Sequence, residues 1–195
     1  MVKTKQRKMK MKKLAIMLGV VALAAVTQAA SFSWKTSYSG KVYAPETSSV
    51  IASATAYLFD ASATSQASLV EAFAAGTLDL TSGSLSSAAI TDGKIATTTF
   101  TDGTAVGDSL TAYFAAVVNI EGTDYLFVAD TVSAAGLEGK TSQMQFAANT
   151  ASQAAAMDAS AGYSKGGWYA AVPEPTSGLL MLVGLAGLAL RRRRA

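Results

Sequence analysis

The clearest signal in the chain is an alternation of apolar and other side chains in its central part. One face of segment 50–59 is apolar throughout and is formed by Val50, Ala52, Ala54, Ala56 and Leu58. Because successive side chains of a strand point to opposite faces, this pattern predicts a β-strand over 50–59. Segment 109–120 has the same period, and both of its faces are largely apolar, which is typical of a central strand. With a turn at Glu121-Gly122-Thr123 and a return strand over 124–132, it predicts a hairpin.

Residues 66–75 follow a different period. Leu69, Val70 and Phe73 fall on one face of a helix, Ser65 is suited to the N-cap, and Gly76 is suited to the position after the C-terminus. We predict one short amphipathic helix here, with its apolar side packed over the end of a sheet.

Shorter segments complete the predicted fold. Asp92-Gly93 and Asp102-Gly103 are expected to form tight hairpin turns, since this dipeptide tolerates the positive φ angles of such turns. The Ala-rich segment 149–161 fits either a loop or a short helix. The remaining predicted strands cover 34–43, 77–80, 85–90, 94–101, 143–148, with Met144 and Phe146 inward, and 168–172. The pattern predicts a mainly β fold, an antiparallel β-sandwich with one short helix, flanked by an N-terminal signal helix and a C-terminal transmembrane helix.

The N-terminus has the three parts of a secretory signal peptide. Residues 1–13 are rich in Lys and Arg, residues 14–26 are apolar, and small residues follow at Thr27-Gln28-Ala29. We predict cleavage after Ala29. An uncleaved N-terminal anchor is the alternative.

The C-terminal end also has three parts. Pro173-Glu174-Pro175 comes first, an apolar segment covers 178–190, and Arg191, Arg192, Arg193 and Arg194 precede the last residue. As a helix, segment 178–190 would be about 20 Å long, whereas a bilayer core is about 30 Å thick. The segment is therefore short for a permanent anchor. The arginines are costly to translocate and are expected to stay cytoplasmic as a stop-transfer signal.

This order of parts, with Val172-Pro173-Glu174-Pro175-Thr176-Ser177 at its start, resembles the PEP-CTERM sorting signal of Gram-negative bacteria. The resemblance covers residues 173–195. It implies that Pro173, Glu174 and Pro175 are recognised by an exosortase, a membrane cysteine transpeptidase that processes the tail during export. A weak single-pass anchor is the alternative interpretation.

Charge separates the targeting segments from the rest of the chain. The whole chain carries +3, but between Ser31 and Val172 five Lys stand against twelve Asp and Glu, which leaves −7. An acidic domain lacks the basic footprint that nucleic-acid binding requires. The chain contains neither Cys nor His, which excludes disulfides, Cys-His pairs, Ser-His-Asp triads and the usual zinc sites.

Three candidate sites remain, each with a simpler explanation. The aspartates near strand ends could bind calcium, although turns already explain two of them; they are Asp92, Asp102, Asp108, Asp124 and Asp130. Carboxylates could pair as in a glycosidase; the candidates are Glu71, Asp79, Glu121 and Glu138. Aromatic residues could form a carbohydrate-stacking patch if the first and last strands pair, and cross-strand packing is the favoured alternative; they are Trp34, Tyr38, Tyr43, Tyr163, Trp168 and Tyr169.

We thus expect a signal peptide over 1–29, a secreted β-rich domain over 30–172, and a sorting signal over 173–195 with its transmembrane segment at 178–190. The expected function is that of a non-enzymatic structural or matrix-associated protein of the cell envelope. It would pass an inner-membrane intermediate and reach the cell surface or extracellular matrix of a Gram-negative bacterium. Expected partners are signal peptidase and exosortase during export, the membrane, and an exopolysaccharide as a candidate; no metal, cofactor or nucleic acid is expected. A carbohydrate- or calcium-binding adhesion module is the main alternative, and a small hydrolase is the weaker one.

Overall fold

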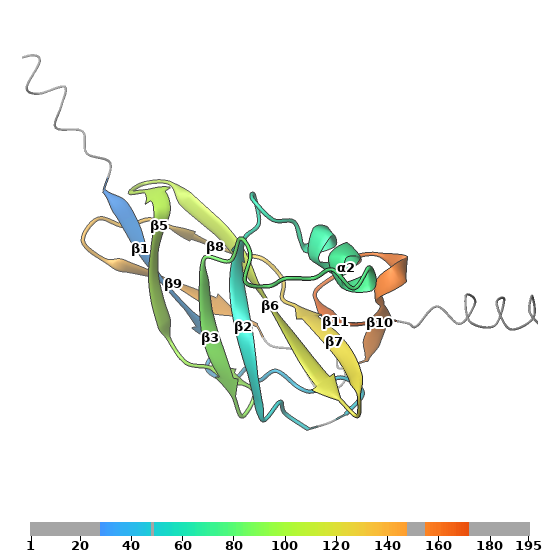
Figure 1. The fold of residues 1–195 in the computed structure, drawn as a ribbon. Coiled ribbons are helices and arrows are strands. Elements are labelled where there is room, and N and C mark those ends of the chain that lie inside the picture. Colours follow the sequence, from blue (N-terminus) through green and yellow to red (C-terminus); the bar gives the residue numbers. More distant parts are fainter. Residues whose placement is uncertain (1–27, 48, 148–154, 172–195) are drawn as a thin grey trace, which may run out of the picture.

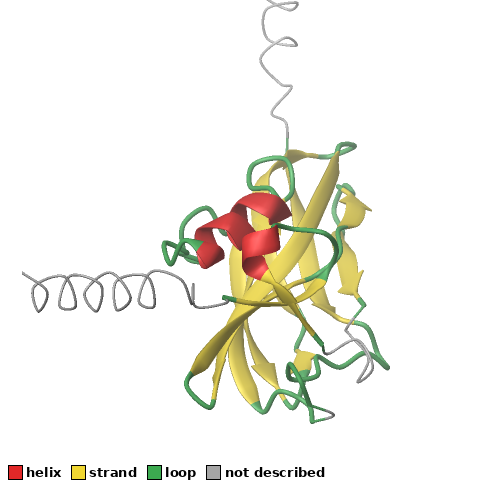
Figure 2. Cartoon of the chain, turned by 90° about the vertical axis from the view of Figure 1, so that its right-hand side faces the viewer, coloured by secondary structure: helices red, strands yellow, loops and turns green. Residues whose placement is uncertain are grey.

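The computed structural model describes residues 28–47, 49–147 and 155–171, and this part of the chain is mainly β with one α-helix. Two β-sheets enclose a shared core, and helix α2 lies against the outer face of the larger sheet (Figures 1 and 2). In chain order the elements are β1 (Ala29–Thr36), β2 (Ser53–Asp60), α2 (Gln66–Ala74), β3 (Ser86–Thr91), β4 (Lys94–Ile95), β5 (Thr98–Ala105), β6 (Ser109–Ile120), β7 (Thr123–Val128), β8 (Val132–Ala135), β9 (Thr141–Phe146), β10 (Ala156–Asp158), the 3-10 helix η2 (Ala159–Ala161) and β11 (Gly167–Ala170).

The sheets are mixed in direction. The smaller one has the order β5-β1-β9, and the larger has the order β10-β11-β7-β6-β2-β3-β4, with β8 paired to the first residues of β6. Most pairs are antiparallel, but β1–β9 and β10–β11 are parallel. The expected wholly antiparallel arrangement is therefore wrong for these two pairs. Neither pair is joined by a tight turn, so no hairpin imposes an antiparallel direction on it.

Strand β6 separates two apolar cores. Its even-numbered side chains, such as Phe114, lie between the two sheets, and its odd-numbered ones, such as Tyr113, lie beneath α2. The Phe114 ring centroid is 5.3 Å from that of Phe127 and 5.4 Å from that of Phe146. Because both faces of β6 are covered, both must be apolar, and the prediction of a central strand over 109–120 is confirmed.

Helix α2 forms where the sequence predicts it. The Ser65 side chain accepts a hydrogen bond from the backbone N–H of Ser68 at 3.1 Å, which caps the first turn. After the helix, Gly76 has a φ of 68°, a conformation in which glycine carries no Cβ penalty. The buried residues are the three that define the predicted apolar face, and they pack on the outer face of the larger sheet.

Two of the predicted tight turns are confirmed. Asp92 and Gly93, with φ angles of 50° and 72°, connect β3 to β4. Glu121 and Gly122, with φ angles of 51° and 84°, connect β6 to β7. Two successive positive φ angles match the twist of the flanking strands, which is why such turns dominate short hairpins.

The third predicted turn, Asp102-Gly103, is wrong. Both residues lie inside β5, and Gly103 is absent from the residues with positive φ. The pairing of β1 with β5 jumps from Ser31↔Thr101 to Ala29↔Ala105, so β5 carries extra residues there. Asp102 instead holds a β-bulge, because its carboxylate accepts from the Thr104 backbone N–H at 2.8 Å and from the Thr104 hydroxyl at 3.0 Å.

Several boundaries differ from prediction. The first strand begins and ends earlier than 34–43, and Tyr43 lies outside the named strands, in an isolated bridge with Val50. Segment 94–101 is divided between β4 and β5, and 77–80 is not a strand. Both partners of β2 are already taken by β3 and β6, so no strand position beside β2 is open to 77–80. Strands β8 and β10 were missed, and the described part of 149–161 forms β10 and η2.

Side-chain hydrogen bonds link the two sheets at two places. The Thr36 hydroxyl oxygen on β1 accepts from the Ile95 backbone N–H on β4 at 3.2 Å. On the other side, the Ser142 hydroxyl on β9 donates to the carbonyl of Ala135 on β8. Thr36 and Ser142 are both buried. These bonds occupy backbone groups that would otherwise lie at open sheet edges, where strands of other molecules can add.

Candidate functional site

The segment that leads into the C-terminal tail is firmly held. Strand β11 pairs with β7 on one side and β10 on the other, and Trp168 and Tyr169 are fully buried on its opposite faces. The indole N–H of Trp168 donates to the carbonyl of Tyr43 at 2.9 Å. The Tyr169 hydroxyl donates to the Lys165 carbonyl at 2.7 Å. The last ladder residue, Ala170, is followed after two residues by Pro173.

The predicted sorting residues themselves lie outside the described residues. This holds for Pro173, Glu174 and Pro175, for the apolar segment 178–190, and for Arg191 to Arg194. Within the residues that the structure describes, no helix has the length and apolar character needed to cross a membrane.

The predicted signal cleavage site falls at the start of β1. Ala29 pairs with Ala105, and Ala30 is only 1% exposed. A cut after Ala29 would place the new α-ammonium on Ala30. Burying an unpaired charge is costly, so the first residue of the mature chain would have to turn outward from the sheet. Nearly all of 1–29 lies outside the described residues, and the cut stays a prediction.

The aspartates considered for calcium are dispersed over the fold. Asp92 is in the β3–β4 turn and Asp102 in the β5 bulge. Asp124 accepts from the Asn119 amide at 2.6 Å, and Asp130 accepts from the Gly166 backbone N–H at 3.3 Å. Asp108 lies between β5 and β6. Among the described residues, no group of three or more acidic side chains could hold a metal ion.

The carboxylates considered for glycoside hydrolysis come from four different segments. Glu71 is on α2, Asp79 is in the loop after α2, and Glu121 is in the β6–β7 turn. Glu138 lies between β8 and β9. A general acid at neutral pH needs a raised pKa. Hydrogen bonds from Thr81 instead lower the pKa of Asp79, so its carboxylate is ionised.

The predicted aromatic patch is not formed. Strands β1 and β11 belong to different sheets, so Trp34 and Trp168 do not pair as edge neighbours. Both are fully buried in the core between the sheets. Tyr169 lies in the other core, where its ring stacks on Tyr163 at 6.1 Å, whereas Tyr38 is 94% exposed. Cross-strand packing, the simpler explanation, accounts for the tryptophans.

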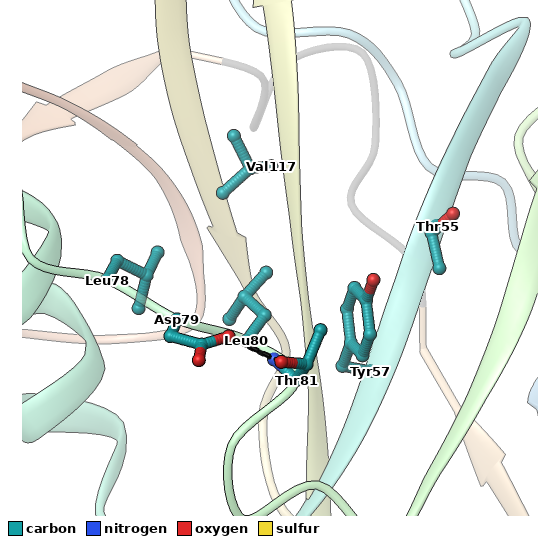
Figure 3. A pocket seen from close by; sticks show the side chains of 7 residues that line it. All are labelled: Thr55, Tyr57, Leu78, Asp79, Leu80, Thr81 and Val117. Atoms are coloured by element: carbon teal, nitrogen blue, oxygen red, sulfur yellow. Dashed lines mark hydrogen bonds between the residues drawn. The ribbon is translucent and has the colours of Figure 1, made fainter.

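A groove that the sequence did not reveal lies on the outer face of the larger sheet, beside α2. It has a volume of about 390 Å³ and is open to solvent. Strands β2 and β6 form one side, and the loop after α2 forms the other (Figure 3). The lining residues are Thr55, Tyr57, Leu78, Asp79, Leu80, Thr81 and Val117.

The groove combines an aromatic ring with one fixed carboxylate. Tyr57 is half-buried, and Leu80 and Thr81 lie between its ring and Asp79 (Figure 3). Oδ1 of Asp79 accepts from the Thr81 hydroxyl at 2.6 Å and from the Thr81 backbone N–H at 2.9 Å. These bonds fix the carboxylate beside the groove. Thr81 also provides the main reason why the pKa of Asp79 lies below its usual range.

The sequence alone does not predict the groove, because the residues that line it come from three separate segments. Thr55 and Tyr57 alternate on β2, 78–81 follow the helix, and Val117 is on β6. The local sequence feature that could have pointed to the groove is the mixed polar and aromatic face of 50–59, which carries Thr55 and Tyr57.

The comparisons with known proteins bear on the tail. The PEP-CTERM protein-sorting motif matches residues 171–194, starting directly after the last residue of β11. No curated protein and no solved structure matches the chain. The chain thus carries a PEP-CTERM protein-sorting motif, as the sequence predicted, and this motif indicates an exported protein that is sorted by an exosortase.

Proposed function

We propose that this chain is a non-enzymatic structural or matrix-associated protein that acts at the cell surface or in the extracellular matrix of a Gram-negative bacterium. In this proposal, signal peptidase removes the N-terminal segment after Ala29. Exosortase then recognises Pro173, Glu174 and Pro175 while Arg191 to Arg194 remain on the cytoplasmic side. The observation that carries the proposal is the PEP-CTERM motif at residues 171–194.

The position of the motif supports this order of events. The last strand of the described residues, β11, ends at Ala170, and the motif match begins at the next residue. Removal of the tail beyond this point would therefore leave every strand of the described residues in place. A domain of this kind can stay folded after its sorting signal has been cut off.

The composition of the domain supports a non-catalytic role. With no Cys and no His in the chain, nucleophilic catalysis of the Cys-His or Ser-His type is impossible. The net charge of −7 between Ser31 and Val172 disfavours anionic partners such as nucleic acids. The hydrogen bonds that link the two sheets occupy backbone groups near the sheet edges, which suits a protein that must stay folded at high local concentration.

Replacement of Pro173-Glu174-Pro175 by three alanines tests the sorting step. We expect the variant to keep its tail, as measured by intact mass, and to accumulate in the inner membrane. A variant in which Arg191 to Arg194 are all lysine keeps the positive charge and serves as the control that should be processed normally. Normal tail loss and normal surface delivery of the alanine variant would contradict the proposal.

The matrix role needs a separate measurement. After fractionation of cells, medium and extracellular polysaccharide, we expect the processed protein to be enriched in the polysaccharide fraction and released by mild glycan digestion. Recovery of the processed protein only as a free species in the medium would argue against matrix association, even if the tail is removed as expected.

A further inference from the structure

The groove beside α2 has the chemical elements of a sugar-binding site. Carbohydrate rings present apolar C–H faces and polar hydroxyl edges, so they need an aromatic or aliphatic surface next to fixed polar groups. Tyr57, Leu78 and Val117 supply half-buried apolar surface. Asp79 and Thr81 supply a carboxylate and a hydroxyl held together by hydrogen bonds. Its volume of about 390 Å³ lies in the lower part of the ~300–1,000 Å³ range of small-molecule sites.

The charges of the groove indicate which kind of sugar fits. Asp79 is the one charged residue among the seven that line it. The face of the Tyr57 ring also attracts cations, because an aromatic π face carries partial negative charge. The surrounding domain is acidic as well, with −7 between Ser31 and Val172. All three features favour a cationic sugar, and they disfavour a uronic acid.

We propose that this groove binds a hexose unit with a free amine, of the kind found in a partly deacetylated amino-sugar polysaccharide. A sugar ring lies on Tyr57, and an ammonium group of the glycan donates to the carboxylate of Asp79. Since the groove is open to solvent, the other units of a bound polymer can remain in solvent outside it. This inference deepens the proposed matrix role and rests on it, because it names the class of matrix glycan.

Ligand-observed NMR with the full-length chain in detergent micelles tests the proposal directly. The probes are three tetrasaccharides of similar length: glucosamine, N-acetylglucosamine and galacturonic acid. We expect saturation transfer to the glucosamine tetramer, weaker transfer to the neutral tetramer, and none to the acidic one. Raising the salt concentration should weaken binding of the glucosamine tetramer, because exposed charge pairs are screened.

Two substitutions separate the ring from the charge. Asp79→Asn keeps an oxygen for the Thr81 hydrogen bonds but removes the charge, so we expect it to weaken glucosamine-tetramer binding about fivefold and to leave the neutral tetramer unaffected. Tyr57→Leu keeps apolar packing but removes the ring, and it should weaken both. Asp108→Asn removes the same charge from an exposed position outside the groove and should change neither.

Specific results would overturn the proposal. Absence of saturation transfer to the glucosamine tetramer at millimolar concentration would do so. Equal binding of the three tetramers, or glucosamine binding that is unchanged in both groove variants, would also do so. These assays use purified glycans and do not depend on export. Their failure is therefore distinguishable from failure of the sorting and fractionation experiments above.

Discussion

Substitution of Trp168 by alanine gives a demanding test of how the last strand is held. The Trp168 side chain is fully buried, its ring centroid lies 5.1 Å from that of Phe127, and its indole N–H donates to the Tyr43 carbonyl. Truncation of a buried Trp or Phe costs about 3–5 kcal/mol, including the cavity left behind. Loss of the partly buried hydrogen bond from the indole N–H to the Tyr43 carbonyl adds about 1 kcal/mol. We therefore expect Trp168→Ala to lower the free energy of unfolding by about 4–6 kcal/mol.

Urea unfolding of the full-length chain in micelles, followed by tryptophan fluorescence, measures this loss. The other tryptophan, Trp34, is also fully buried and remains as the reporter in the variant. Trp168→Phe should fall in between, since it keeps much of the ring but loses the N–H donor. Tyr38→Ala is the control, because Tyr38 is 94% exposed and loses an exposed contact with the Lys94 ammonium, so stability should change by less than about 1 kcal/mol. A loss below about 2 kcal/mol for Trp168→Ala would refute the packing argument, because it lies under the range for buried aromatic truncations.

Three further predictions concern the helix, the turns and acid stability. Ser65→Ala removes the N-cap of α2 and should cost about 1 kcal/mol in urea unfolding, whereas Ser62→Ala, outside the helix, should cost less. Gly93→Ala should destabilise strongly, since its φ is 72° and a Cβ would lie 2.9 Å from the Val42 carbonyl oxygen. Gly103→Ala meets nothing within 4 Å and should be neutral or slightly stabilising, and a clear loss of stability in this variant would contradict the placement of Gly103 inside β5. Hydrogen bonds from Thr81 lower the pKa of Asp79. The stabilisation from ionised Asp79 is therefore fully present above the usual pKa of 3.8, and it is lost as the pH falls through the lowered pKa. The melting temperatures of wild type and Asp79→Asn should accordingly show a different pH dependence only below about pH 4.

The sequence predicts those elements of the fold whose defining residues lie within one segment of the chain. Strand 109–120 and the helix after Ser65 were predicted well, because their periods and cap residues are read within one segment. The Asp102-Gly103 bulge was misread as a turn, since the same dipeptide serves both and only the pairing with β1 decides between them. The parallel pairing of β1 with β9 has no local signature at all.

The candidate sites follow the same rule. The sorting motif is contiguous, so it could be found from residues 173–195 alone, and the family comparison confirms it over 171–194. The aromatic patch failed because it depended on β1 pairing with β11, which the topology does not allow. The groove of Tyr57 and Asp79 could not be predicted, because it exists only once β2, β6 and the loop after α2 are brought together.

If the proposed sorting route holds, the short stretch of chain between strand β11 and the apolar tail segment limits where an unprocessed molecule can act. From Ala170 to Gly178 there are eight residue steps, which even fully extended reach at most about 28 Å. The domain itself has a radius of gyration of about 14 Å. While its tail is held in a membrane, the domain can therefore explore only a thin layer next to the bilayer, and glycan farther out is beyond its reach. Removal of the tail, more than its insertion into the membrane, would then determine when the domain first contacts the matrix and how far from the membrane it can do so.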